Sequence, residues 1–195
     1  MTPHVDSGHM CDSVVKQFKA LPHCSILPYD NAGYDIGAYQ WAAQNTHADL
    51  MLCLTASTYF NGRSGWLKRV VDSYLKYGDQ LYGTMGHCGD PRDAINRHIR
   101  STAFWITPGL ILKYPIRVKE FNQRYEFEHR KNCLTEWIIA QGKMAIVVTW
   151  DGEYEWGHWN DFPNGYFRGD QSNVMIGDHV TERVGIYLKE KANRG

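Results

Sequence analysis

The order of apolar and polar residues predicts helices and strands that alternate along the chain. In residues 66–77 (WLKRVVDSYLKY) the apolar side chains recur at helical spacing, which indicates an amphipathic helix. The same spacing predicts helices at 11–20, 36–45, 119–125 and 134–141, and a closing helix after Thr181. Short, largely apolar runs predict strands at 25–29, 49–54, 81–84, 101–107 and 144–149, of which the one at 49–54 is expected to be buried. The alternation favours an α/β fold with a mostly parallel central sheet flanked by helices.

Length and the first residues set the expected domain organisation. A chain of 195 residues is long enough for one substantial domain and short for two. Residues 7–10 read Ser-Gly-His-Met, which is typical of a cloning remnant, so we expect residues 1–10 to be disordered or vector-derived. Residues 11–195 are then expected to form a single domain.

Composition and charge exclude several classes of function. The formal net charge is +0, whereas a nucleic-acid-binding domain normally has an excess of clustered Lys and Arg. No apolar run is long enough to span a bilayer, and no signal segment opens the chain. The 5 cysteines lack CxxC spacing, which disfavours a disulfide framework or a structural zinc site and favours a reducing compartment. We therefore expect a cytoplasmic protein without a membrane span or a nucleic-acid partner.

Two predicted strands end in residues that suit a nucleotide site. After the first strand, Asp30 and Asn31 lead through Gly33 and Asp35 into a helix. Glycine allows a tight turn and close backbone approach, and a helix start offers free N–H groups to an anion. Asp35 is a hydrogen-bond acceptor for a ribose or base, or alternatively a plain N-cap of the helix.

The second strand end is Thr55-Ala56-Ser57-Thr58, which follows the buried run DLMLCL. The order of these motifs resembles that of GT-A glycosyltransferases, in which N-x-G and a Gly-Ala helix precede a strand ending in L-D-x-D-D. Here the matching residues are Asn31-x-Gly33, Gly37-Ala38 and the DLMLCL-TAST stretch. The variant N-x-G-x-D-x-G-A is similar to the branch of rhamnan-synthesis and viral or phage glycosyltransferases.

The resemblance implies the GT-A fold and a nucleotide-diphosphate sugar, UDP- or dTDP-linked, as the donor. It implies a nucleotide over Asp30–Asp35 and a diphosphate near Thr55 and Ser57, whose alternative role is to cap the following loop. The D-x-D motif of the family falls on these two hydroxyls and is degenerate here. A divalent Mn or Mg ion is compatible with the family but unsupported by the sequence, because such ions prefer charged oxygen ligands. No metal ligand is assigned, and the usual first strand of the fold is not recognised.

Three carboxylates are candidates for the catalytic base. In inverting members of the family this base lies near the start of the helix that here ends at Gly142. Glu128 and Glu136 lie in that region, and Asp170 lies in a Gly-Asp-Gln segment that resembles an acceptor-side D-Q motif of several families. Exposed helix surface is the alternative for both glutamates, and a helix cap is the alternative for Asp170. A base must come within hydrogen-bond reach of the attacking hydroxyl, which spacing does not reveal.

The leading hypothesis is a glycosyltransferase of polysaccharide biosynthesis that moves a sugar to a hydroxyl of a glycan, protein or lipid-linked acceptor. The acceptor is expected beside residues 156–170, whose aromatic side chains suit the apolar faces of sugars, although core packing is the alternative. The rival hypothesis is a non-catalytic glycan- or nucleotide-binding module that keeps the fold. Another nucleotide-dependent α/β enzyme has little support, because neither GxGxxG nor GxxxxGK[ST] occurs.

Overall fold

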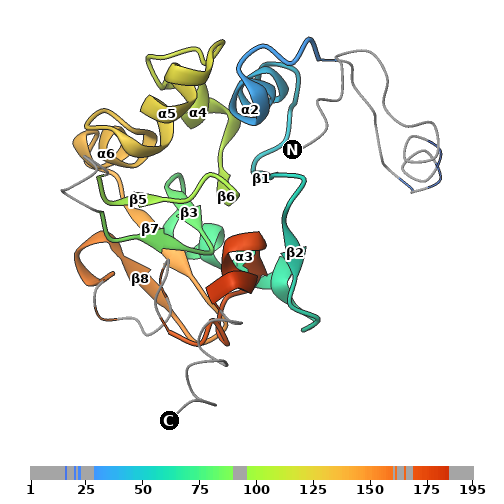
Figure 1. Cartoon of the computed structure of the whole chain (residues 1–195), viewed down its shortest axis with the longest axis vertical. Helices are drawn as coiled ribbons and strands as arrows, with labels where there is room; N and C mark the ends of the chain where they lie inside the picture. The colour runs from blue at the N-terminus through green and yellow to red at the C-terminus, as the bar shows by residue number, and fades with distance from the viewer. Residues whose placement is uncertain are drawn as a thin grey trace.

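The computed structural model describes residues 16, 20, 22, 29–89, 96–159, 161, 165 and 169–184. The predicted N-terminal segment 1–10, most of the predicted helix at 11–20 and most of the predicted strand at 25–29 lie outside the described residues. Figure 1 shows the arrangement of the elements along the chain.

The described helices match most of the predicted ones. They are α2 (Tyr34–Gln44), α3 (Trp66–Tyr77), α4 (Pro108–Lys113), α5 (Phe121–His129) and α6 (Leu134–Ala140), with a short 3-10 turn η2 (Trp156–His158). Helix α4 was not expected, although Thr107 caps it through a side-chain hydrogen bond from Leu110 N and a proline occupies its first turn. These are ordinary start signals of a helix. The closing helix that was expected after Thr181 is present but begins earlier, since residues 179–184 are helical.

The strands form a five-stranded sheet and two small two-stranded ones. They are β1 (Met51–Leu54), β2 (Tyr59–Phe60), β3 (Leu81–Gly83), β4 (Gly86–His87), β5 (His98–Ile99), β6 (Ala103–Ile106), β7 (Ala145–Val148), β8 (Glu153–Glu155) and β9 (Ile176–Gly177). The main sheet has the order β1-β6-β3-β7-β8, while β2 pairs with β9 and β4 with β5. The chain is therefore an α/β protein with a mixed sheet.

The expectation of a mostly parallel sheet was wrong. Only the β3–β7 pair of the main sheet is parallel, and the β1–β6, β3–β6 and β7–β8 pairs are antiparallel. The hydrogen bond from Thr84 N to the Ala103 carbonyl shows that β6 begins beside the end of β3. Strand β6 must therefore run in the direction opposite to β3. Strand β8 follows β7 after a short turn, and a turn of that length can join only antiparallel strands.

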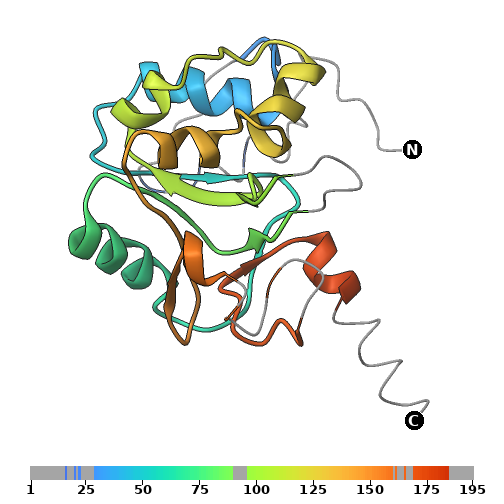
Figure 2. The same ribbon diagram turned by 90° about the vertical axis from the view of Figure 1, so that its left-hand side faces the viewer.

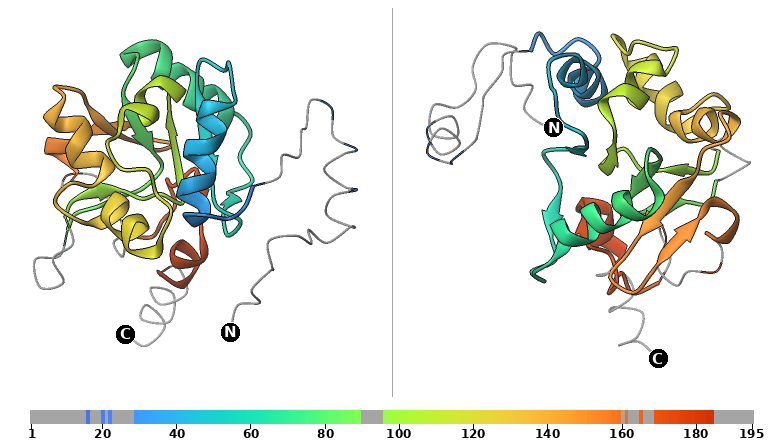
Figure 3. Two further views of the ribbon diagram at one scale, coloured as in Figure 1. Left: turned by 90° about the horizontal axis from the view of Figure 1, so that it is seen from above. Right: turned by 180° about the vertical axis from the view of Figure 1, so that it is seen from behind.

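The sheet separates two hydrophobic layers. Successive residues of a strand point to opposite faces, so Phe104 and Val147 pack beneath the helices, while Trp105 and Ile146 face the other way. Figures 2 and 3 show α2, α4, α5 and α6 over one face of the sheet and α3 over the other. Among the described residues, no helix has the length and apolar character needed to cross a membrane.

The segment from Gln171 to Gly177 packs against residues from the middle of the sequence and lies across one edge of the sheet. Strand β9 pairs with β2, the side chain of Asn61 donates to the Val174 carbonyl, and Trp150 N donates to the Asn173 carbonyl at 2.9 Å. Val174, Met175 and Ile176 are buried. Figure 1 shows this C-terminal segment close to β2. The last described part of the chain thus belongs to the core.

Candidate functional site

Three strands of the main sheet end at the same edge. Strand β1 is antiparallel to β6 and β6 is antiparallel to β3, so β1 runs in the direction of β3 and of its parallel neighbour β7. Their carboxyl ends lead into Thr55, Thr84 and Thr149. In open α/β sheets, ligands bind beyond the carboxyl ends of parallel strands. We refer to this place as the carboxyl edge.

Thr55 and Ser57 present hydroxyls at the carboxyl edge. Their side-chain oxygens lie 3.1 Å apart in a hydrogen bond, Ser57 is exposed and Thr55 is half-buried. Thr55 N donates to the Thr102 carbonyl at 3.0 Å, which holds the loop against the start of β6. Neutral hydroxyls do not fit the Mg²⁺ or Mn²⁺ of a sugar-nucleotide site, because these ions bind best to charged oxygen ligands. The same two hydroxyls can instead donate hydrogen bonds to a phosphate.

The other two threonines of the edge serve the fold. Thr84 Oγ1 donates to the Ile176 carbonyl at 3.0 Å, which fixes the C-terminal segment. Thr149 Oγ1 accepts from the backbone N–H groups of Asp151 and Gly152 and closes the β7–β8 turn. Both side chains are therefore committed to structural contacts.

Much of the Asp30–Asp35 segment serves to seat α2. Asp30 accepts a hydrogen bond from Ala32 N, and Asn31 has a left-handed backbone with φ 61°. Gly33 has φ 80°, and a Cβ there would lie 1.9 Å from the Val118 carbonyl oxygen. The close backbone approach expected at this glycine is therefore to the protein's own chain.

Asp35 makes an ion pair instead of capping α2. Its carboxylate accepts from Arg124 Nε at 2.8 Å and from Arg124 Nη2 at 3.3 Å. The N-cap position of α2 is Gly33, which has no side chain to offer. The pair joins α2 to α5 and occupies the acceptor that was assigned to a ribose or base.

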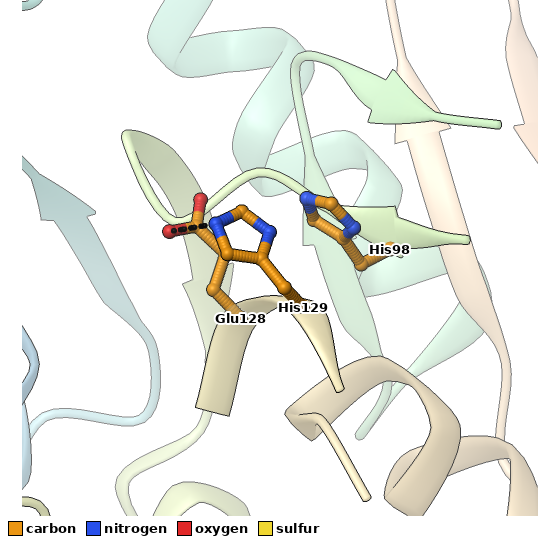
Figure 4. Close-up of side chains that lie close together, drawn as sticks. All are labelled: His98, Glu128 and His129. Atoms are coloured by element: carbon orange, nitrogen blue, oxygen red, sulfur yellow. Dashed lines mark ion pairs between the residues drawn. The ribbon is translucent and has the colours of Figure 1, made fainter. Parts of the chain in front are cut away.

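A group of three titratable side chains joins β5 to the end of α5. His98 in β5 meets Glu128 and His129 in the last turn of α5, and their ligand atoms lie within 4.8 Å of one another. Figure 4 shows the His129 ring between the Glu128 carboxylate and the His98 ring. We call these three residues the His-Glu-His cluster.

The cluster is held from outside by hydrogen bonds and ring contacts. His98 Nδ1 lies 2.7 Å from the Asn96 carbonyl oxygen, so it carries the proton of the neutral ring and donates it there. Ser101 N donates to Glu128 Oε1 at 3.2 Å, and His129 Nε2 lies 3.5 Å from Glu128 Oε2. His129 Nδ1 is buried without a hydrogen-bond partner among the described residues.

Burial and neighbouring charges set the protonation states in the cluster. Burial lowers the pKa of His98 to about 4, so its imidazole is neutral at neutral pH. Burial lowers the pKa of His129 as well, against the attraction of Glu128. Burial tends to raise the pKa of Glu128, but the adjacent histidine rings and the Ser101 N–H outweigh it and lower that pKa. The cluster therefore combines neutral imidazole with a carboxylate.

The cluster adjoins the carboxyl edge. Ser101, whose N–H binds Glu128, immediately precedes Thr102, whose carbonyl accepts from Thr55 N. Arg100 pairs with Asp178 of the C-terminal segment at 2.7 Å, and both side chains are almost fully buried. Hydroxyls, imidazoles, carboxylates and a guanidinium thus share one region of the molecule.

The remaining candidate bases lie in different environments. Glu136, in the first turn of α6, is half-buried, and burial raises its pKa while Arg97 opposes the rise. Its neighbour Thr135 accepts from Ile99 N at 3.0 Å, which places the start of α6 beside β5. Asp170 is exposed, and its Oδ1 accepts from Ser172 N at 2.9 Å in a local turn.

The aromatic segment divides into core and surface. Trp159 is fully buried, and its Nε1 donates to the Tyr154 carbonyl at 3.0 Å, so it packs in the core. Trp156 is half-buried beneath Arg97, whose guanidinium lies 5.3 Å from the ring centre and also donates to the Trp156 carbonyl. Phe162 and Tyr166 lie outside the described residues.

Sequence reasoning missed the cluster as a unit. Glu128 was considered as a base, while His129 was not singled out. The Glu-His pair, which lies three residues beyond the helix predicted at 119–125, was a weak local signal, and the partner His98 is distant in sequence. Comparison of the chain with protein-family models, with curated proteins and with solved structures finds no match to any of them.

Proposed function

We propose that the chain is a glycosyltransferase domain that moves a sugar from a nucleotide diphosphate to an acceptor hydroxyl. The observation that carries the proposal is the convergence of β1, β3 and β7 at one carboxyl edge, with the mutually hydrogen-bonded hydroxyls of Thr55 and Ser57 beside it. The motif order N-x-G, Gly-Ala helix and strand-end hydroxyls supports the same assignment. In this proposal the donor diphosphate binds over the loop that follows β1.

The diphosphate is bound through hydrogen bonds in this proposal. The Thr55 and Ser57 hydroxyls now satisfy each other, and each can turn to donate to a phosphate oxygen. Asp35 is not part of the donor site in this proposal, because Arg124 donates hydrogen bonds to both of its carboxylate oxygens. Oriented donors that face the leaving group stabilise the charge that develops on it.

Glu136 is the proposed catalytic base. Glu136 is half-buried at the start of α6 beside β5, and burial raises its pKa toward the working pH at which a base is most effective. Glu128 is instead bound by Ser101 N and has a lowered pKa, and Asp170 accepts from Ser172 N in an exposed turn. In the transfer, the acceptor oxygen bonds to the anomeric carbon as the bond from that carbon to the diphosphate oxygen breaks. The hydroxyl proton passes to Glu136, and the nucleoside diphosphate leaves with the electron pair.

Nucleotide binding tests the site. In calorimetric titrations of the whole chain with UDP and dTDP, with and without manganese, we expect binding by at least one nucleotide. The double variant Thr55→Ala/Ser57→Ala removes one mutual hydrogen bond at the surface, so it should fold normally and lose most of that affinity. Lack of binding by either nucleotide under both conditions would refute the proposal.

Turnover tests the chemistry. With a donor sugar bound by the chain, Glu136→Gln should lower sugar release or transfer by about 100-fold or more without weakening nucleotide binding. The matched control is Glu182→Gln, an exposed carboxylate in the closing helix. Binding without any turnover in the unmodified chain would instead identify a non-catalytic binding module.

A further inference from the structure

We propose that His98, Glu128 and His129 bind a zinc-class divalent metal ion. The site goes beyond the proposed sugar transfer and does not depend on it. Two imidazoles and one carboxylate form a donor set that protein zinc sites use, with a water in the fourth position. The three ligand atoms already lie within 4.8 Å of one another.

Two of the three ligands, His98 and Glu128, are oriented by a contact on their far side. The Asn96 carbonyl accepts from His98 Nδ1 at 2.7 Å, which leaves the lone pair of Nε2 for a metal. Ser101 N holds Glu128 Oε1, while Oε2 faces the inside of the cluster, 3.5 Å from His129 Nε2. Such outer contacts are typical of metal-binding histidines and carboxylates, because they fix the tautomer and the ring orientation.

An unsatisfied atom points to a missing ligand. His129 Nδ1 is buried without a hydrogen-bond partner among the described residues, and a buried polar atom without a partner is costly. Bonds of about 2.1 Å to a tetrahedral metal separate the ligands by about 3.4 Å, so small side-chain rotations would close the site. The His129 side chain is 23% exposed and Glu128 is 11% exposed, which gives an ion and its water an entrance.

The charge around the site permits a cation. Arg100, Arg124 and Arg130 all act electrostatically on His129. Arg100 is paired with Asp178 at 2.7 Å and Arg124 with Asp35 at 2.8 Å, which balances two of these positive charges. The Glu128 carboxylate attracts the ion. Nitrogen donors favour zinc over magnesium, which prefers oxygen.

The test is metal binding by the whole chain without any nucleotide. The protein is dialysed against a chelator and titrated with ZnCl₂ by calorimetry, with MgCl₂ in parallel and with elemental analysis of the retained metal. We expect one tightly bound zinc per chain and no comparable binding of magnesium. His98→Ala and His129→Ala should each weaken zinc binding by at least about 100-fold, more than the loss of an outer contact does.

Controls separate this site from other histidines. His158→Ala should leave zinc binding unchanged, because His158 is exposed and pairs with a neighbouring surface residue, Asp161. X-ray absorption of the zinc-loaded unmodified chain should show two imidazole ligands, a result that does not depend on whether the variants fold. The proposal is overturned if no zinc is retained, if zinc stays bound in the His98→Ala/His129→Ala double variant, or if absorption shows sulfur ligands.

Discussion

The ion pair between Arg100 and Asp178 offers a sharp test of how the C-terminal segment is held. Asp178 Oδ2 lies 2.7 Å from Arg100 Nη1, with the aspartate side chain 2% exposed and the arginine side chain 11% exposed. The other oxygen, Oδ1, accepts from Val180 N and Thr181 N and caps the closing helix. The substitution Asp178→Asn keeps an acceptor for the cap and removes the charge, so it isolates the ion pair.

The expected cost follows from burial. Removing one partner of a buried ion pair costs about 3–5 kcal/mol, because the remaining charge stays in a poorly solvated place. Arg100 retains slight exposure, so we expect a loss near the lower end, about 3 kcal/mol in the free energy of unfolding. For a chain of this size, that corresponds to a melting temperature lower by about 6–12 °C.

The effect should depend on pH with a definite sign. Arg100 and the helix N–H groups lower the pKa of Asp178 below its ordinary value of 3.8, although burial opposes them. The stabilisation is therefore complete above that ordinary value and disappears as the pH falls through the lowered one. Urea unfolding followed by circular dichroism should show a constant difference between the variant and the unmodified chain at neutral pH, and a shrinking one below about pH 4.

A matched exposed pair supplies the control. Lys68 and Asp72 form an ion pair on the surface of α3, with side chains 78% and 43% exposed. Asp72→Asn should change stability by no more than about 0.5 kcal/mol, because solvent screens such pairs. A cost below about 1 kcal/mol for Asp178→Asn, or equal costs for the two substitutions, would refute the reasoning from burial.

Three further substitutions test the packing. Gly33→Ala should destabilise the chain by about 1–3 kcal/mol in urea unfolding, because its backbone is left-handed and the added Cβ would collide with the Val118 carbonyl. Gly109→Ala should instead be neutral or stabilising by up to about 1 kcal/mol, since it lies in a helix with open space around it. Trp159→Ala should cost about 3–5 kcal/mol, which a melting curve would reveal, because the ring is fully buried. A much smaller loss of stability for Trp159→Ala would contradict core packing and favour contact of this ring with an acceptor sugar.

Local sequence patterns predicted many of the elements. Helix α3 occupies residues 66–77 as predicted, and β7 lies inside the predicted run at 144–149, because amphipathic spacing and apolar runs are local properties. Strand β8 was missed, since its residues Glu153–Glu155 are half-exposed at the end of the sheet and carry no continuous apolar run. The direction of a strand depends on the path of the connections between elements, which a local pattern does not show. The sheet was therefore wrongly predicted to be mostly parallel.

The candidate site divides in the same way. Residue order alone predicted that the hydroxyls of Thr55 and Ser57 follow strand β1. It also predicted that this position is a poor site for a magnesium or manganese ion. The ion pair between Asp35 and Arg124 could not be predicted, because it joins two helices whose packing does not follow from the local sequence pattern. It gives Asp35 a contact in the fold, and the role of Asp35 as a ligand acceptor stays a prediction.

By itself, the sequence determined many of the helices and strands, though not α4 or β8, and showed which strand ends carry polar groups, because these follow from backbone preference and the spacing of apolar residues. Tertiary structure alone decided that β6 lies between β1 and β3 and that His98 meets Glu128 and His129. Such contacts join residues far apart in the chain. They form only when the packing of the whole core offsets the entropy of ordering the intervening loops.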